Sequence, residues 1–363
     1  VALRLNTTGT NNVAIGDGAM ENNTAGSVNV AIGTRALSSA TNANAAVSIG
    51  YEALRNNSSA TSQVAIGYRA LPISNLNSGN PTIAIGTQAL ENATGANAQN
   101  LAIGSFAMQQ TTTGVGNVAI GATNAMYNNQ TGNGNVGVGN GVMYANVSGA
   151  QNSTIGGLGL NFNVAGSQQT VVGRQGFGQN TNVVTGLGTV VGGSGYTDGT
   201  YTGVELMPTN FSWGPTPTVA TRVVSGGTVT SVTLTGGGWA VPSTAILAIS
   251  SYFNPIPSGL LTGSGFTVLV SSVVTGTQNT GLGAFVGLNN ITGSRNVFLG
   301  YNAGRNETTS DNLYISNSDT ANALIKGKFD ASGGFAGSVR INGALQLTSQ
   351  PPASATAGGT QGT

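Results

Sequence analysis

Carboxylates are the side chains of this sequence best suited to acid–base chemistry, because it contains neither His nor Cys. Without His, the chain lacks the usual general base near neutral pH and the commonest metal ligand. Without Cys, it can form neither disulfides nor thiolate sites. Two carboxylates roughly 5–10 Å apart could still hydrolyse a glycosidic bond. The first 178 residues hold four acids: Asp17, Glu21, Glu52 and Glu91.

No convincing catalytic pair emerges from these acids. Glu21 and Glu91 occupy the same position of a repeat, but four repeat units separate them, which corresponds to about 19 Å. Asp17 and Glu21 could approach one another, yet two solvated charges at the end of a stack explain them as well. Asp198 and Glu205 remain as later candidates, and acids of neighbouring chains in an oligomer could also meet. We expect no catalytic residue and no enzyme, and we keep a polysaccharide-degrading spike as an alternative.

Metal and phosphate sites are not expected either. The segment Glu307–Asp311 offers oxygen ligands but is typical of a polar turn. Calcium-binding β-rolls need an Asp in every nonapeptide, and the sequence lacks that pattern. Gly186-Leu-Gly188 and Gly281-Leu-Gly283 lack the strand–loop–helix context of a phosphate loop. The sequence therefore predicts no metal and no cofactor.

The composition narrows the class of protein further. Lys and Arg number 11 against 10 Asp and Glu, so no basic excess favours nucleic acid as a partner. Charged residues make up 6% of the chain, whereas about 25% is usual for a soluble domain. At 39% hydrophobic, the chain can form a long core, but no run approaches the roughly 18 apolar residues of a spanning helix. We expect no membrane insertion.

A repeat must position whatever functional side chains exist. The motif Asn-Val-Ala-Ile-Gly and its variants end at ten glycines, from Gly16 to Gly173, spaced 17, 17, 17, 19, 18, 17, 18, 17 and 17 residues apart. Such even spacing is typical of a solenoid, in which each unit buries its apolar face on the next. The motif residues on which this prediction rests are Asn12, Val13, Ile15, Gly16, Asn29, Ile32, Gly33, Ile49, Gly50, Ile66, Gly67, Ile85, Gly86, Ile103, Gly104, Ile120, Gly121, Asn296 and Gly300.

Each repeat predicts one coil of a parallel β-roll or β-solenoid. Side chains alternate along a strand, so Val13 and Ile15 share one face, which we expect to be the buried one. The glycine permits a corner, and a segment such as Ala19-Met20 supplies a second short apolar strand. Equivalent residues then form ladders, including an Asn ladder whose amides bond one another. At about 4.8 Å per coil, ten coils form a rod on the order of 45–50 Å long.

A coil of about 17 residues encloses a thin core. Burying one apolar side chain stabilises the fold by roughly 1.5–3 kcal/mol. Ordering the backbone of each residue costs about 1–2 kcal/mol. Because some five apolar residues per coil do not offset that loss, we expect a homotrimer. In this prediction the Ala-Leu and Ala-Met segments pack around a shared axis.

The motif Asn-Val-Ala-Ile-Gly followed by x-x-Ala resembles the head repeat of trimeric autotransporter adhesins, which is shorter and forms left-handed parallel β-rolls. Asn296–Gly304 and Thr308–Ser316 resemble repeats near the distal end of bacteriophage tail fibres, and Gly327–Phe329 and Val339–Leu347 resemble segments that follow them. The likeness covers about residues 1–192 and 278–347. It implies a virion tail appendage whose partners are other tail or baseplate proteins and a host cell-surface glycan or protein. The head of a bacterial trimeric adhesin, on the bacterial cell surface, is the alternative.

Residues 194–277 interrupt the repeat. This stretch contains both Trp residues and six of the ten Pro. Alternating apolar runs flank Ser225-Gly226-Gly227, which predicts a β-hairpin and hence a small inserted antiparallel β-domain. Its aromatic side chains could stack on sugar rings, although they could equally form the core of the domain itself. The candidates for glycan binding are Tyr196, Tyr201, Phe211, Trp213, Trp239 and Tyr252.

The sequence thus predicts an all-β homotrimeric fibre that acts as a rigid shaft and a host-surface adhesin. Its expected parts are a repeat solenoid over 1–193, an inserted β-domain over 194–277, resumed repeats over 278–320, a C-terminal β cap over 321–350 and a flexible tail over 351–363.

Overall fold

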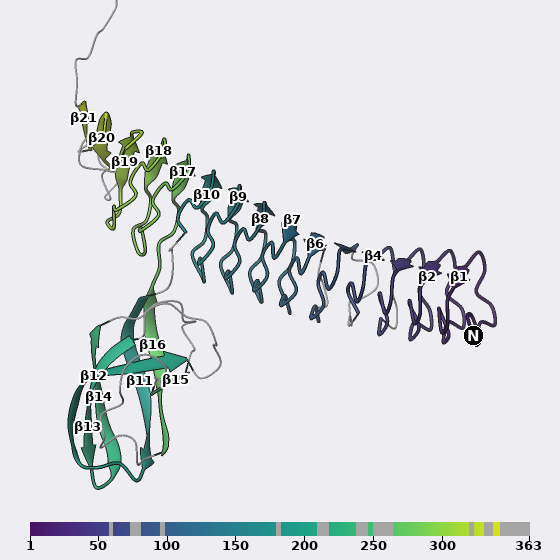
Figure 1. The fold of residues 1–363 in the computed structure, drawn as a ribbon, viewed down its shortest axis with the longest axis horizontal. Helices are drawn as coiled ribbons and strands as arrows, with labels where there is room; N and C mark the ends of the chain where they lie inside the picture. Colours follow the sequence, from purple (N-terminus) through teal and green to yellow (C-terminus); the bar gives the residue numbers. More distant parts are fainter. Residues whose placement is uncertain are drawn as a thin grey trace, which may run out of the picture.

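The computed structural model describes residues 1–57, 61–72, 81–94, 99–178, 183–208, 218–236, 246–249, 264–318, 323–329 and 337–341. These residues form two β-sheets, and none of them belongs to a helix long and apolar enough to cross a membrane. Figure 1 shows a long rod of stacked coils with a separate six-stranded sheet hanging from one side, near its C-terminal end.

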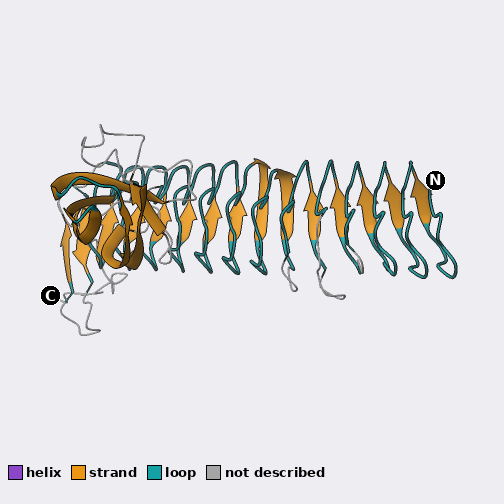
Figure 2. Ribbon diagram, turned by 90° about the horizontal axis from the view of Figure 1, so that it is seen from below, coloured by secondary structure: helices purple, strands orange, loops and turns teal. Residues whose placement is uncertain are grey.

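The rod is a parallel β-solenoid, as the repeat predicts. Its 15-stranded sheet contains, within the described residues, thirteen parallel strands, one for each coil, which lie side by side along the rod in Figure 2. The first ten are β1 (Val13–Ile15), β2 (Val30–Ile32), β3 (Val47–Ile49), β4 (Val64–Ile66), β5 (Ile83–Ile85), β6 (Leu101–Ser105), β7 (Val118–Thr123), β8 (Val136–Val138), β9 (Ser153–Ile155) and β10 (Thr170–Val172). The others are β17 (Thr280–Leu282), β18 (Val297–Leu299) and β19 (Asn312–Ile315), followed by antiparallel β20 (Ile325–Lys328) and β21 (Ser338–Ile341).

Neighbouring coils pair their motifs in strict register. Val13 lies opposite Val30 and Ile15 opposite Ile32, and each later coil repeats this pairing. Strand β10 pairs directly with β17, although more than 100 residues separate them. The inserted sheet therefore leaves the solenoid stack unbroken.

The strands turn their small residue inward, so the prediction that Val and Ile fill the core is wrong. The middle residues, such as Ala31 and Ala65, are fully buried, whereas Ile15 at the end of the rod is 58% exposed and Ile155 in its middle is 54% exposed. The inside of a coil is narrow, and Leu or Met from the facing segment already fills it. Ala fits opposite these side chains, and the β-branched pair must point outward.

The facing segment is a series of turns, not the second strand that we expected. We call the residues between each corner glycine and the following Asn-rich corner the return segment. In coil after coil it holds two side chains with positive φ, such as Arg35 at 57° and Leu37 at 52°. A left-handed conformation costs a non-glycine residue roughly 1–2 kcal/mol. The return segments tolerate this cost because Leu37 and its equivalents are completely buried.

The core keeps its volume by exchanging large and small residues between its two sides. In the early coils Ala on the strand faces Ala-Leu on the return segment. Where the strand carries Thr154, the return segment has Gly159, whose added Cβ would lie 2.5 Å from the threonine methyl. Where the strand carries Phe298, the return segment has Gly304, whose added Cβ would lie 2.5 Å from the ring.

The predicted Asn ladder is confirmed and is buried. Asn29 donates from its backbone N–H and from Nδ2 to Asn12 Oδ1, each at 3.0 Å. Asn117, Asn135 and Asn152 repeat this arrangement further along the rod. The amides of these rungs are thus satisfied by the coils beside them, which removes the penalty for burying an unpaired polar group.

The inserted sheet is antiparallel, in the order β11-β16-β15-β12-β13-β14. Its strands are β11 (Val183–Ser194), β12 (Gly199–Pro208), β13 (Thr218–Ser225), β14 (Thr228–Gly236), β15 (Ile246–Ile249) and β16 (Ser264–Val274). The predicted hairpin joins β13 and β14, with positive φ at both Gly226 (62°) and Gly227 (73°).

The inserted sheet starts earlier than the predicted boundary at residue 194. Strand β11 begins at Val183 and pairs with β16 from Val183↔Val274 to Ser194↔Ser264. The run Val190-Val-Gly192, which we assigned to the repeat, therefore belongs to the insertion. Its apolar alternation fits a long antiparallel strand as well as a solenoid motif, so the sequence alone could not separate the two.

Candidate functional site

The outward side chains of the parallel strands form a largely apolar strip along the rod, with Ser153, Thr170 and Thr280 as its polar members. Each coil contributes the first and third residues of its motif, which for β19 are Leu313 and Ile315. Ile155 is 54% and Leu282 is 53% exposed, whereas the strip residues of β2 to β7 are half-buried. The strip consists of Val13, Ile15, Val30, Ile32, Val47, Ile49, Val64, Ile66, Ile83, Ile85, Leu101, Ile103, Val118, Ile120, Val136, Val138, Ser153, Ile155, Thr170, Val172, Thr280, Leu282, Val297, Leu299, Leu313 and Ile315.

Charged side chains avoid this strip. In residues 1–178, every charged residue except Arg4 follows a corner glycine, and Arg4 pairs with Glu21 on the next coil. None lies in a strand motif or in the Asn-rich corner. These residues are Arg4, Asp17, Glu21, Arg35, Glu52, Arg55, Arg69, Glu91 and Arg174. One long side of the rod is thus apolar and the side beyond the corner carries the charge.

The strip has the properties of a protein–protein interface. Thirteen coils at about 4.8 Å each make it about 60 Å long. Soluble monomers rarely expose apolar patches larger than a few hundred Å², and larger ones mark contact surfaces. The Ala-Leu and Ala-Met segments, by contrast, are fully buried within the single chain. Our expectation that these segments meet at a trimer axis is therefore wrong, because they have no surface left to offer.

The two buried acids of the solenoid, Glu52 and Glu91, are held in one ion-pair network. Arg55 and Arg35 lie 2.7 Å and 3.5 Å from Glu52 Oε1. Arg69 approaches Glu52 at 3.9 Å and binds Glu91 at 3.0 Å. Burial raises the pKa of Glu52, but the hydrogen bond and charge of Arg55 outweigh it and leave the pKa below its usual value. Glu52 is therefore a stable carboxylate that has no proton to donate.

The other candidate acids have structural partners as well. Asp17 binds the amino group of Val1 at 2.9 Å, and this hydrogen bond lowers the pKa of the Asp17 carboxyl. Glu21 binds Arg4 at 2.9 Å, so the two acids of the first coil do not share a site. In the insertion, the backbone N–H of Gly227 donates to Asp198 at 2.8 Å and lowers its pKa. Within the described ranges no three acidic residues gather to hold a metal ion.

The aromatic residues predicted to bind glycan are not brought together on a described surface. Tyr196 is 5% exposed and lies in the core of the inserted sheet, where its hydroxyl accepts a hydrogen bond from the backbone N–H of Phe266. Tyr201 is half-buried and donates its hydroxyl to Thr197 O at 2.8 Å. The other four lie outside the described residues: Phe211, Trp213, Trp239 and Tyr252.

The core of the insertion contains a residue that the sequence did not suggest. Arg222 on β13 is completely buried, and its guanidinium lies 3.6 Å above the ring of Phe266 and 5.5 Å from that of Tyr196. Among the described residues, none of its three nitrogens has a hydrogen-bond partner. Burial lowers the pKa of Arg222. The alternating run Thr218 to Val224 contains this residue at an inward position, which is the one signal that could have identified it.

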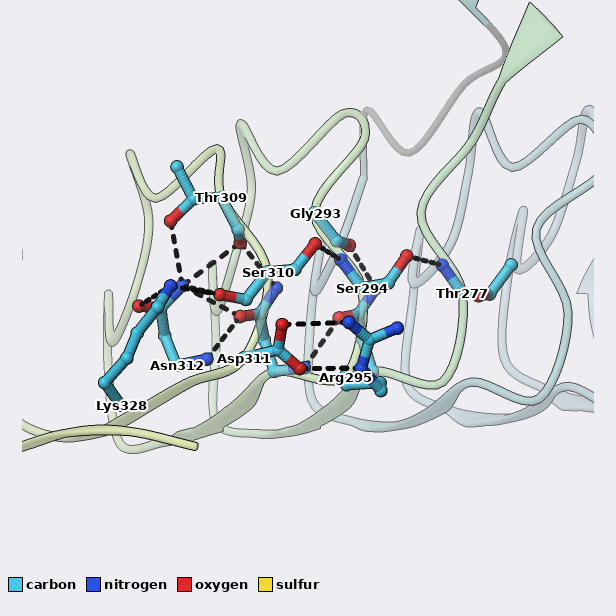
Figure 3. Close-up of polar contacts among 11 residues, drawn as sticks. Thr277, Gly293, Ser294, Arg295, Thr309, Ser310, Asp311, Asn312 and Lys328 are labelled. Atoms are coloured by element: carbon cyan, nitrogen blue, oxygen red, sulfur yellow. Dashed lines mark hydrogen bonds and ion pairs between the residues drawn. The ribbon is translucent and has the colours of Figure 1, made fainter. Parts of the chain in front are cut away.

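The C-terminal end of the Asn ladder is closed by a lysine (Figure 3). Asn312 donates from Nδ2 to Asn296 Oδ1 at 3.0 Å, which continues the ladder. No further parallel strand follows β19 in the described part of the chain, and Lys328 on antiparallel β20 donates instead to Asn312 Oδ1 at 3.2 Å and to Ser310 O. Beside it, Arg295 and Asp311 form a two-bond ion pair at 2.6 and 2.8 Å. The change of strand direction and this ammonium group together end the stack.

Comparison with known proteins adds no assignment, because no family model, curated protein or solved structure matches the chain.

Proposed function

We propose that this chain is a structural virion protein, a tail fibre that serves as a rigid homotrimeric shaft and attaches the particle to a host-cell surface. The motif resemblance to tail-fibre repeats and to trimeric adhesin heads supports this function. The straight solenoid supports the shaft role, since each coil is tied to its neighbours by backbone pairing and by the Asn ladder. Its partners would be two further copies of itself, other tail or baseplate proteins, and a host surface glycan or protein.

The apolar strip is the observation that carries the proposal. The strip leaves Val, Ile and Leu half-buried or exposed on coil after coil, so it needs a cover, and two other copies of the same strip match it in length and spacing. Packing three strips around an axis would bury the outward residues and leave the charged return segments in water. The number three comes from the resemblance, since a dimer would cover the strip as well.

The position of the insertion fits an adhesive role. In Figure 1 the parallel strands follow one long edge of the rod, and the inserted sheet projects from the opposite side. If the strands face the axis of a trimer, three inserted sheets point away from it. Such a display would let several weak contacts act together, with a gain of 10²–10⁴ in overall affinity when geometry permits.

Two other functions remain as alternatives. The Asn-Val-Ala-Ile-Gly motif itself equally favours the head of a bacterial trimeric adhesin on a cell surface. A polysaccharide-degrading spike is disfavoured, because the buried acids of the shaft, Glu52 and Glu91, are paired with arginines.

Native mass spectrometry of the purified chain tests the shaft. We expect three times the chain mass of 35.9 kDa. A stable monomer would contradict the proposal, because the strip would then have no cover. Finding the protein in purified virions would favour the tail fibre, whereas finding it on bacterial cells without phage would favour the adhesin.

A further inference from the structure

The middle of the rod has an uncharged surface. Residues 92–173, which supply coils from β6 to β10, contain no Asp, Glu, Lys or Arg. The coils before them carry the Arg35–Glu52–Arg69 network on the same return side. The return segments of these two regions therefore differ in charge while sharing one backbone. A binding partner of the uncharged region must be recognised without ion pairs.

Two columns of side chains line the return segments of this region. One contains Tyr127 and Tyr144, whose rings stack with centroids 5.2 Å apart and planes 8° from parallel. Both rings are half-buried, and burial raises the pKa of the Tyr144 hydroxyl. Asn161 occupies the same position one coil further on. In this column phenol and amide groups follow one another at the spacing of the coils.

The neighbouring column continues the same chemistry. Asn92 donates from Nδ2 to Gln110 Oε1 at 3.1 Å, and Gln110 donates from Nε2 to the hydroxyl of Tyr127 at 3.4 Å. Further along this column lie Asn128, the buried Ala145 and Phe162, of which Phe162 is 40% exposed. We call Gln110, Tyr127, Asn128, Tyr144, Asn161 and Phe162 the neutral face.

We propose that the neutral face binds a neutral oligosaccharide that runs along the rod axis. The two stacked rings present their edges and hydroxyls to a ligand along the rod. Amides and phenols both donate and accept hydrogen bonds, as sugar hydroxyls require. The coil spacing of about 4.8 Å is close to the length of one hexopyranose unit. A chain of such units could therefore meet an equivalent side chain on each coil. The absence of charge favours neutral sugars over uronates and sialylated glycans.

This site would remain open in the proposed trimer, because it lies on the return segments and not on the apolar strip. The inference rests on the adhesive part of the proposed function and names its ligand class. Glycan binding does not depend on the number of chains, so the glycan proposal and the trimer proposal can fail separately.

A printed array of neutral and acidic oligosaccharides tests the proposal with the full-length protein. We expect retention by neutral glycans that is unchanged between about 0.15 and 0.5 M NaCl, since no ion pairs are involved. The variant Tyr127→Gln/Tyr144→Asn introduces residue types that the same column already carries at Gln109 and Asn161. It should keep the fold and weaken binding about tenfold or more.

The matched control is Tyr51→Thr/Tyr68→Thr. These tyrosines also stack, with centroids 5.4 Å apart, but they lie in the charged coils, and Thr34 and Thr87 flank them in the same column. We expect this control to bind like the parent chain. Retention only by acidic glycans, retention by none, or loss with Trp239→Ser but not with the shaft variant would each overturn the proposal. A trimeric mass that persists in any of these cases would leave the shaft role standing.

Discussion

The solenoid and the inserted sheet satisfy their side chains in different ways. In the solenoid, the partner of a residue is usually its own copy one coil away, as for Asn29 with Asn12 or Tyr144 with Tyr127. In the inserted sheet, partners differ in type, as for Arg222 with Phe266. In a repeated fold, a polar or outward apolar residue can therefore bond to or pack against its own copy on the next coil. In an ordinary sheet each side chain needs a partner of a different type. Arg222 has no hydrogen-bond partner among the described residues.

The largest expected effect comes from placing a charged residue in the apolar strip. Ile103→Lys would place three ammonium groups around the axis of a trimer, where they would repel one another and lose their water. We expect the native mass to fall to that of a monomer while the circular dichroism spectrum stays unchanged. Asn56→Lys, on an exposed return-segment position, is the control and should remain trimeric. A trimer that survives Ile103→Lys would show that the strip is not the interface.

The next effect concerns the corner glycines, each of which lies against the corner glycine of the next coil. Gly50 has φ of 126°, and a Cβ added to it would lie 2.4 Å from Gly67 O. Gly50→Ala should therefore lower the free energy of unfolding by about 3 kcal/mol or more. Gly116 also has positive φ, at 66°, but nothing lies within 4 Å of an added Cβ. Gly116→Ala should cost about 1 kcal/mol. Denaturant titration of both variants measures the difference, and equal losses would mean that conformation alone, not the contact between coils, sets the need for glycine.

The same comparison explains how much of the structure the sequence reveals. Residues at fixed intervals must stack, so the coils, their order and the Asn ladder follow from the spacing alone. The direction of a three-residue strand does not follow, because Val13-Ala-Ile15 alternates equally well with either face inward. Our expectation chose the β-branched face from its hydrophobicity. The deciding factor was the volume of Leu37 and its equivalents across the narrow core.

The candidate sites were less predictable than the fold. The apolar strip was visible in the sequence but was assigned to the core. The neutral face needed the register of the return segments, which brings Gln110 beside Tyr127. In the insertion, strand pairing could not be derived because no period relates β11 to β16, which are about 80 residues apart in sequence.

A smaller effect is expected from removing one rung of the Asn ladder. Asn117 donates from Nδ2 to Asn100 Oδ1 at 3.3 Å and to Gly132 O at 2.8 Å. Its Oδ1 accepts from the N–H of Asn135. Asn117→Ala would leave these buried groups without partners and should cost about 2–3 kcal/mol in unfolding free energy. Asn128→Ala, at a half-buried surface position, should change it by less than about 0.5 kcal/mol. If both variants unfold alike in denaturant, the ladder contributes no more than an exposed amide.

The smallest effect is expected in the insertion, where the substitution should raise the free energy of unfolding and not lower it. Arg222→Met keeps a long side chain against Phe266 but removes a buried charge that has no hydrogen-bond partner in the described part of the insertion. Desolvation of a guanidinium costs more than a cation–π contact of about 2 kcal/mol returns, so we expect a gain of about 1 kcal/mol. Both Trp residues lie within 194–277, so Trp fluorescence reports the unfolding of this region. Arg222→Ala would leave a cavity and should instead destabilise the insertion by about 3 kcal/mol. A loss with Met as large as that with Ala would show that the charge itself stabilises the sheet.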